Sequence, residues 1–254
     1  MQDLLASGEY VEATVTSVER SSLQCIVSEG RDPIVGTVNG VRYNLVEKRA
    51  FATGDVVRVR VQQLQPSVVM SIEKSFIKPL LVFDVHGVLG ERTPFQKYSK
   101  KTRKFVLRPH CEEFLKFCFK YYEVAVWSSA LLKNVTLSMF SADKEDEFSP
   151  LFVWSQADIT DLSPIMSFRK ASKPLYLKEL SRLWECFPSY DSTYSLLLDN
   201  DLEKCAVCGT VILYSNLFVH TYLFYGVANC CFDVFLEKSL WITAIYSHIR
   251  LCSH

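Results

Sequence analysis

Polar and acidic side chains follow three apolar runs that are typical of buried strands. These are Asp84 after Leu80–Phe83, Ser128 and Ser129 after Glu123–Trp127, and Asp199 and Asn200 after Tyr194–Leu198. In open α/β sheets, ligands and reacting groups gather outside the carboxyl ends of the strands. We therefore expect these side chains to lie along one edge of a parallel sheet.

This set of residue types fits phosphoryl transfer. A carboxylate can attack phosphorus and form an acyl-phosphate. Because carboxylate and phosphate repel each other, the reaction needs a cation such as Mg²⁺, which prefers carboxylate, carbonyl and water oxygens. Asp84 and Asp199 would supply carboxylates, and Asn200 could add a carbonyl oxygen or hold a metal-bound water. The pattern predicts Mg²⁺ as the cofactor.

A hydroxyl and backbone N–H groups at Ser128 and Ser129 could bind the oxygens of the transferring phosphoryl group. Lys178 lies in a segment, Pro174–Trp184, whose leucine spacing predicts a helix. Its ammonium group would neutralise the charge shared by nucleophile and phosphate. An acidic strand end by itself is more often a helix cap or a turn. Four such elements in this order are hard to obtain by accident.

The elements from residue 76 onward alternate between strands and helices. Besides the three strands, the apolar spacing predicts helices over Pro109–Tyr122 and Leu131–Phe140. Pro109 suits the first turn of its helix. Alternating strands and helices predict an α/β class, with a Rossmann-like parallel sheet.

Residues 1–75 have a different pattern, which predicts a small all-β barrel. Alternation puts Val11, Ala13 and Val15 on one face of a strand, and Val57, Val59 and Val61 on one face of another. The dipeptide Asn39-Gly40 separates Ile34–Val38 from Val41–Val46, and predicts a hairpin between them. Further strands are expected at Leu23–Val27 and Val68–Ile72.

This segment resembles the OB-type RNA-binding repeat of bacterial ribosomal proteins and exoribonucleases. The resemblance is carried by Gly8–Val15, Gly54–Val59 and Met70–Lys74. It implies RNA as a partner, with bases stacking on exposed aromatic rings, for which the candidates are Tyr10, Tyr43 and Phe51. Against this, the segment carries 8 Lys and Arg and 9 Asp and Glu, a net charge of −1, whereas nucleic acid favours positive charge. A barrel for protein contacts or packing is the alternative.

Residues 78–204 resemble the haloacid-dehalogenase superfamily, and within it the phosphatases of the RNA polymerase II C-terminal domain, of the nuclear-LIM-interactor-interacting-factor type. The resembling segments are Leu81–Leu89, Leu107–Leu115, Tyr122–Ala130, Tyr176–Leu180 and Leu197–Asn200. The resemblance implies a protein phosphatase acting on phosphoserine or phosphothreonine. It implies Asp84 as nucleophile and metal ligand, and the backbone carbonyl of His86 as a second ligand. It also implies Ser128 as phosphate binder, Lys178 as charge stabiliser, and Asp199 and Asn200 at the metal.

His86 is the main departure from that family. The family has a second aspartate there, which protonates the leaving oxygen and then deprotonates the attacking water. An imidazole titrates near pH 6.5 and can serve as acid and base, but it is larger and its nitrogens would sit elsewhere. We therefore expect a weakened phosphatase or a phosphopeptide-binding domain without turnover. A third reading is a histidine that performs the relay at a reduced rate.

The end of the chain departs as well. Residues 205–232 contain 28 positions without Lys, Arg, Asp or Glu, a length that would suit a transmembrane helix. Polar Asn216, His220 and Asn229 and two glycines oppose that reading. We interpret residues 209–254 as a divergent, partly buried end of the domain; a membrane anchor and a poorly folding tail are the alternatives.

Composition agrees with an intracellular globular protein. The chain has 254 residues, 49% of them apolar, and a formal net charge of +0. It therefore has no global field that would attract nucleic acid or anionic membrane. Met1–Leu5 lacks a basic segment followed by a long apolar one, so no cleaved secretory signal is expected. Nine cysteines, an odd number, then favour reduced thiols in the nucleus or cytoplasm. The predicted domains are 1–75, 76–208 and 209–254.

Overall fold

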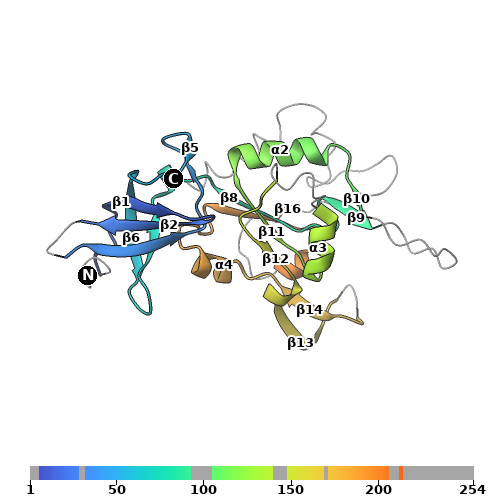
Figure 1. The fold of residues 1–254 in the computed structure, drawn as a ribbon. Coiled ribbons are helices and arrows are strands. Elements are labelled where there is room, and N and C mark those ends of the chain that lie inside the picture. Colours follow the sequence, from blue (N-terminus) through green and yellow to red (C-terminus); the bar gives the residue numbers. More distant parts are fainter. Residues whose placement is uncertain are drawn as a thin grey trace. The chain divides into compact units, whose positions relative to one another are not determined.

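The computed structural model describes residues 6–28, 32–92, 105–139, 148–168, 171–205 and 212–213 (Figure 1). The chain forms two compact units. The first contains the described residues up to Leu80, with residues 121–123 and 180–194; the second contains the remainder.

The first unit contains a closed barrel of five strands. They are β1 (Val11–Val18), β2 (Ser22–Val27), β3 (Ile34–Asn39), β6 (Val56–Gln63) and β7 (Val69–Ile72). Their order is β1-β2-β3-β7-β6, and β6 pairs with β1 to close the barrel. The β3–β7 pair is parallel, and the others are antiparallel. This confirms the predicted small barrel, which closure leaves without a free sheet edge.

Alternation along the strands creates the interior of the barrel. Ala13 and Val15 on β1 are buried, and so are Val57, Val59 and Val61 on β6. Their neighbours in sequence are less buried. Because successive side chains of a strand point to opposite faces, apolar residues at every second position line one face.

The hairpin predicted at Asn39-Gly40 is wrong. β3 pairs with β2 on one side and β7 on the other, so it has no free edge for residues 41–46. Instead, β4 (Tyr43–Asn44) pairs with β5 (Arg49–Ala50). Gly40 supplies a turn with φ of +81°, and its backbone N–H donates to the Ser21 carbonyl at 2.8 Å. The sequence therefore correctly predicted a turn at Gly40. Strand pairing with distant segments decided that residues 41–46 do not form the second strand of a hairpin with β3.

Only part of the predicted stacking surface is accessible. Phe51 is buried, so it cannot stack on a base, which corrects its assignment. Tyr10 and Tyr43 are half-buried. The Arg60 guanidinium lies 5.1 Å from the Tyr10 ring centre, and the Lys78 ammonium 4.2 Å from that of Tyr43.

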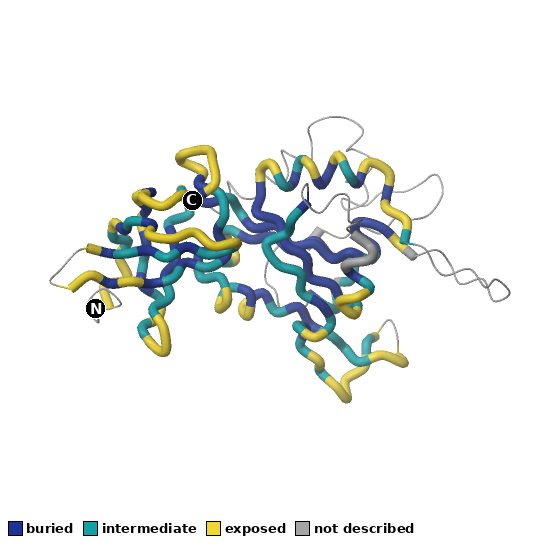
Figure 2. The backbone as a smooth tube through the Cα atoms, viewed as in Figure 1, coloured by how far each residue is buried: buried dark blue, intermediate teal, exposed yellow. Residues whose placement is uncertain are grey.

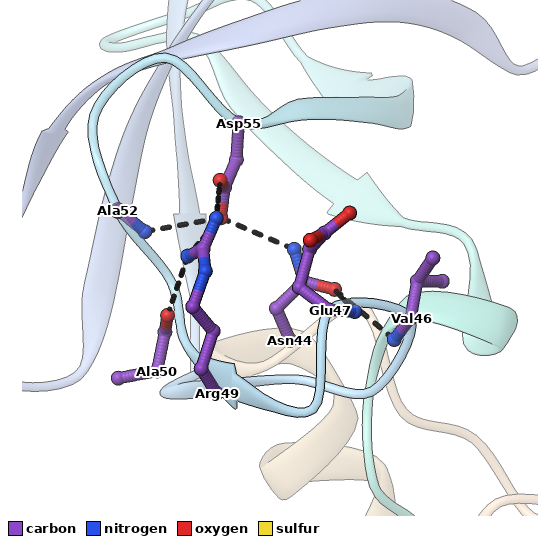
Figure 3. A network of polar contacts seen from close by, with 7 residues as sticks. All are labelled: Asn44, Val46, Glu47, Arg49, Ala50, Ala52 and Asp55. Atoms are coloured by element: carbon purple, nitrogen blue, oxygen red, sulfur yellow. Dashed lines mark hydrogen bonds and ion pairs between the residues drawn. The ribbon is translucent and has the colours of Figure 1, made fainter.

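A polar network around Asp55 closes the loop between β4 and β6 (Figure 3). The buried carboxylate of Asp55 accepts hydrogen bonds from Arg49 Nη2 at 2.5 Å, from the Ala52 N–H at 3.0 Å and from Asn44 Nδ2 at 3.1 Å. These bonds, above all the one from Arg49, lower the pKa of Asp55 against the opposing effect of burial. The network needs the ionised carboxylate.

This predicts an acid-sensitive barrel. A lowered pKa means that Asp55 adds stability at pH values above its unfolded pKa of about 3.9. That contribution is lost as pH falls through the folded value. Asp55→Ala should lower barrel stability at neutral pH by about 1–3 kcal/mol, because buried donors lose their acceptor. It should also flatten the fall of stability as the pH drops below about 4, the unfolded pKa. Denaturant unfolding followed by hydrogen exchange of barrel peptides measures both.

The matched control is Glu12→Ala on the exposed face of β1. It should leave the barrel's stability and its acid sensitivity close to those of the parent. An equal loss in both variants, or an unchanged acid response in Asp55→Ala, would contradict the assigned role of the network.

The second unit is built on a five-stranded sheet. Its strands are β8 (Leu80–Phe83), β11 (Glu123–Trp127), β12 (Val153–Trp154), β15 (Ser195–Leu198) and β16 (Ile212–Leu213), in the order β12-β11-β8-β15-β16. The β11–β12 and β15–β16 pairs are parallel. The three predicted strands are confirmed and lie at the centre. Every residue of β8, β11 and β15 is buried (Figure 2).

Two helices pack on this sheet. They are α2 (Cys111–Tyr121) and α3 (Leu132–Met139), close to the predicted ranges. Phe114 of α2 meets Phe83 edge to face, with ring centres 5.7 Å apart. Val135 of α3 joins a buried cluster with two other valines. Pro109 precedes the helix instead of lying in its first turn, because His110 has a φ of +59°, which a helix does not allow.

The helix predicted over Pro174–Trp184 is wrong in its first half. Pro174–Leu177 is a strand, β14, paired antiparallel with β13 (Thr160–Met166), and α4 begins only at Leu180 and ends at Cys186. Leu177, Leu180 and Leu183 are all buried. Their spacing of three imitates a helical stripe, although it crosses from a strand into a helix. Lys178 therefore lies just after a strand.

The remaining short elements connect these parts. β9 (Gly90–Arg92) pairs with β10 (Phe105–Leu107), and single 3₁₀ turns occur at η1 (Lys74–Phe76), η3 (Gln156–Asp158) and η4 (Leu202–Cys205). None of the helices in the described part of the chain has the length and apolar character that a bilayer-spanning helix needs. Apart from β16, the predicted C-terminal segment 209–254 lies outside the described residues.

Candidate active site

Asp84 and Asp199 lie at the same edge of the sheet, each just after its strand. The backbone N–H of Asp84 donates to the carbonyl of Leu198 at 2.8 Å, which joins the ends of β8 and β15. Both carboxylates are buried, with 1% and 0% of their residue surface exposed. Burial of two acids side by side needs a compensating cation, because like charges repel strongly away from water.

Lys178 is that cation. Its side chain is fully buried, and Nζ donates to Asp199 Oδ2 at 2.5 Å and lies 3.5 Å from Asp84 Oδ1. The backbone N–H of Lys178 donates to the Lys204 carbonyl at 2.8 Å, which fixes the chain where β14 ends. The structure thus brings together three of the predicted site residues.

The charges of this cluster support each other. Burial alone would raise the pKa of Asp84, but Lys178, Lys204 and a hydrogen bond from the Ser128 side chain outweigh it, so the pKa is lowered. Burial would likewise lower the pKa of Lys178, but Asp199 and Asp84 outweigh burial and raise it. These directions favour an ionised Asp84 beside a charged Lys178, whereas burial and the neighbouring Asp84 raise the pKa of Asp199.

Ser128 completes the cluster from the neighbouring strand. It follows β11, is fully buried, and its backbone N–H donates to the Trp154 carbonyl at 2.9 Å. Its Oγ accepts from the Ala130 N–H at 3.4 Å. Its side chain also contributes to the lowered pKa of Asp84. Ser129 is half-buried in the same loop.

Asn200 lies against the loop that follows Asp84. Its side-chain amide would clash with any β-carbon placed on Gly87, which also has a φ of +89°. Only glycine meets both conditions without strain. The loop is held further by Arg108, whose Nη2 donates to the Gly87 carbonyl at 2.6 Å.

Arg108 was not predicted as a site residue. It is buried, and its backbone N–H also donates to the Leu89 carbonyl at 2.9 Å. It therefore fastens the segment that carries Asp84 and His86 to the start of α2. Its local sequence does not indicate this role, because an arginine before a proline is also common in surface turns.

His86 lies two residues after Asp84 and is half-buried. Its imidazole packs edge to face on Phe105 of β10, with ring centres 5.3 Å apart. Part of the ring surface is thus used for packing. An aspartate at this position would be shorter and could not make that contact.

The residues fit the binding of Mg²⁺. Asp84 Oδ1 and Asp201 Oδ1 are buried oxygens without a hydrogen-bond partner among the described residues. Asp199 Oδ2 accepts a hydrogen bond from Lys178 Nζ, and Asp199 Oδ1 accepts one from the Asp201 N–H. Each of these oxygens keeps a second lone pair that could bind a metal ion. In the described part of the chain, no three His, Cys, Asp or Glu side chains form a metal cluster. Mg²⁺ commonly uses only one or two carboxylates, with water and substrate oxygens.

Comparison with known families places these residues in one domain. Residues 79–213 match the model of the family described as NLI interacting factor-like phosphatase. The matched range covers more than half of the chain and contains Asp84, Ser128, Lys178 and Asp199. No curated protein matches the chain. The match confirms the family that the sequence motifs indicated. The chain belongs to the NLI interacting factor-like phosphatases.

Proposed function

We propose that the chain is a Mg²⁺-dependent protein phosphatase that acts on phosphoserine or phosphothreonine through an aspartyl-phosphate on Asp84. One observation carries the proposal: the buried Lys178 ammonium lies between Asp84 and Asp199, at 3.5 and 2.5 Å from their oxygens. A charge-paired carboxylate at the carboxyl end of a central strand supports nucleophilic attack on a phosphate monoester.

The reaction has two steps. Asp84 attacks phosphorus, the bond to the seryl or threonyl oxygen breaks, and that oxygen takes a proton. Water then attacks the aspartyl-phosphate, loses a proton, and releases inorganic phosphate and free Asp84. Bound Mg²⁺, held by Asp84, Asp199, Asn200 and the His86 carbonyl, would offset the repulsion between carboxylate and phosphate. Lys178 stabilises the negative charge on the transferring group, and Ser128 with Ser129 binds its oxygens.

His86 is the residue proposed to move the proton in both steps, at reduced rate. A positioned acid or base contributes about 10²–10⁴-fold. The contact of the imidazole with Phe105 supports a weakened relay, because part of the ring is committed to packing. The same contact favours a second candidate function, a phosphopeptide-binding module that does not turn over its ligand.

The domain division belongs to the proposal too. We assign residues 1–75 to an OB-like barrel, 76–208 to the phosphatase domain and 209–254 to a terminal segment. The strand order with a parallel β3–β7 pair supports the barrel assignment. A phosphorylated protein is the proposed partner of the site. RNA is a weaker candidate for the barrel, supported by Tyr10 and Tyr43 alone now that Phe51 is known to be buried.

An assay of the purified chain tests the function. We expect phosphate release from an aryl phosphate and from phosphoserine and phosphothreonine peptides with Mg²⁺, and none with EDTA. A phosphotyrosine peptide is the matched control and should be a poorer substrate. Equal hydrolysis with and without Mg²⁺ would contradict the mechanism. Tight phosphopeptide binding without any release would favour the binding module.

A further inference from the structure

The β13–β14 hairpin exposes three large apolar side chains close together in sequence. Phe168 is 89% exposed, Ile165 53% and Met166 41%. Figure 2 draws most of β13 as exposed. Single exposed apolar residues are common on protein surfaces, whereas a cluster of them marks a binding surface more often.

Hydrogen bonds stabilise the part of the hairpin that carries these side chains. Thr160 Oγ1 donates to Glu179 at 2.6 Å, and Gln156 Nε2 donates to the Tyr176 hydroxyl at 2.9 Å. Near the tip, the Ser167 N–H donates to the Lys173 carbonyl at 2.9 Å. These hydrogen bonds connect the described parts of the hairpin from Thr160 to Ser167 on one side and from Lys173 to Glu179 on the other.

The hairpin is also joined to the candidate active site at two points. Lys178 follows β14 directly, so the catalytic cation and the strand share one backbone. At the other end, Ser167 Oγ donates to Glu203 Oε2 at 2.7 Å. Glu203 lies in η4, four residues after Asp199. The apolar tip is thus fastened to the segment that leaves the site.

The spacing suits an extended peptide. Pro174, which pairs with Met166, lies four residues before Lys178. At about 3.3 Å per residue this corresponds to about 13 Å along the strand. A peptide whose phosphorylated residue occupies the site would cover that distance with about four to five residues.

We propose that Ile165, Met166 and Phe168 bind a bulky apolar side chain, four to five residues from the phosphorylated residue of a protein substrate. The inference rests on the proposed function and names its substrate class. Three side chains are far fewer than the roughly 20–30 residues a side of a stable protein dimer. Residues 160–177 carry Arg169, Lys170 and Lys173 but only Asp161 as an acid, a net charge of +2, which complements the negative charge of a phosphorylated peptide.

Binding to the Asp84→Asn protein tests this docking without requiring turnover. The probes are fluorescent phosphoserine peptides with a polar background and phenylalanine five residues to either side of the phosphoserine, compared with alanine there. Fluorescence anisotropy should show about tenfold tighter binding of one phenylalanine peptide, as expected for burial of an aromatic side chain. Adding Phe168→Ala should abolish this preference.

The matched control replaces another exposed apolar residue, Val46→Ala, which lies in the first unit and is 55% exposed. It should keep the full preference. In the chain with Asp84 intact, Val46→Ala should also leave aryl phosphate hydrolysis unchanged. Since Phe168 is almost fully exposed, its truncation opens no cavity.

Equal binding of the phenylalanine and alanine peptides, or a preference that survives Phe168→Ala, would overturn the proposal. So would dimer formation or vesicle binding that disappears in Phe168→Ala, since the surface would then serve a second copy or a membrane. The experiment can reject the docking proposal and the proposed phosphatase function independently of each other. A preference lost in Phe168→Ala without any hydrolysis supports docking and rejects the enzyme; hydrolysis without a preference does the reverse.

Discussion

Replacement of Asp84 by asparagine is expected to reduce Mg²⁺-dependent phosphate release by about 10⁴-fold or more, because the nucleophile itself is removed. An amide oxygen is a far poorer nucleophile than a carboxylate and cannot form the acyl-phosphate. The aryl phosphate assay measures the loss, and mass spectrometry after rapid acid quenching should find phosphate on the parent chain but not on the variant.

The fold should survive this change. Asparagine has nearly the volume of aspartate, and Lys178 keeps its 2.5 Å partner Asp199. Replacement also removes one of two neighbouring negative charges. Thermal unfolding should therefore stay close to that of the parent. Asp191→Asn, at a half-exposed carboxylate of the first unit, is the control and should keep full activity. Phosphate release from Asp84→Asn at the parent rate would assign the nucleophile elsewhere.

The second large effect is a gain. His86→Asp should raise phosphate release, by up to the roughly 10²–10⁴-fold that a positioned acid or base usually contributes and by less where the imidazole already supplies part of it. The shorter carboxyl group would fit, because it gives up only the edge-to-face contact with Phe105. Loss of that contact costs about 0.5–1.5 kcal/mol, which a stable domain tolerates. The measurement is the initial rate with aryl phosphate and with a phosphoserine peptide.

His86→Asn separates proton transfer from size. Asparagine matches aspartate in shape but cannot act as an acid or base, so it should show no gain. If both variants accelerate the reaction, relief of crowding by the imidazole explains the effect. If neither does and the parent already turns over well, His86 performs the relay. A silent parent that becomes active in His86→Asp would identify the natural chain as a binding module with the rest of the catalytic apparatus intact.

Local sequence was sufficient for much of the fold. Continuous apolar runs predicted the buried strands β8, β11 and β15, and period-two alternation predicted the inward faces of β1 and β6. Both patterns depend on neighbours along one chain segment. The hairpin at Asn39-Gly40 failed because strand pairing is a choice between distant segments, and both edges of β3 were already occupied.

The candidate site shows the same division. Strand ends placed Asp84, Ser128 and Asp199 along one edge, since parallel strands end on the same side. The sequence also supplied Lys178, but assigned it to a helix. Its position after β14, between two carboxylates, follows from the pairing of β14 with β13 and from the Lys178–Lys204 backbone hydrogen bond.

The sequence by itself determined which residues could carry phosphoryl chemistry, in what order, and to which family they belong. Only the tertiary structure decided three further features: the charge-paired cluster at Lys178, the hold of Arg108 on the Gly87 loop, and the exposed tip at Phe168. The physical reason is common to all three. Burial, ion pairing and exposure depend on which distant segments of the chain come into contact. The periodicity of residues within one segment does not specify those contacts.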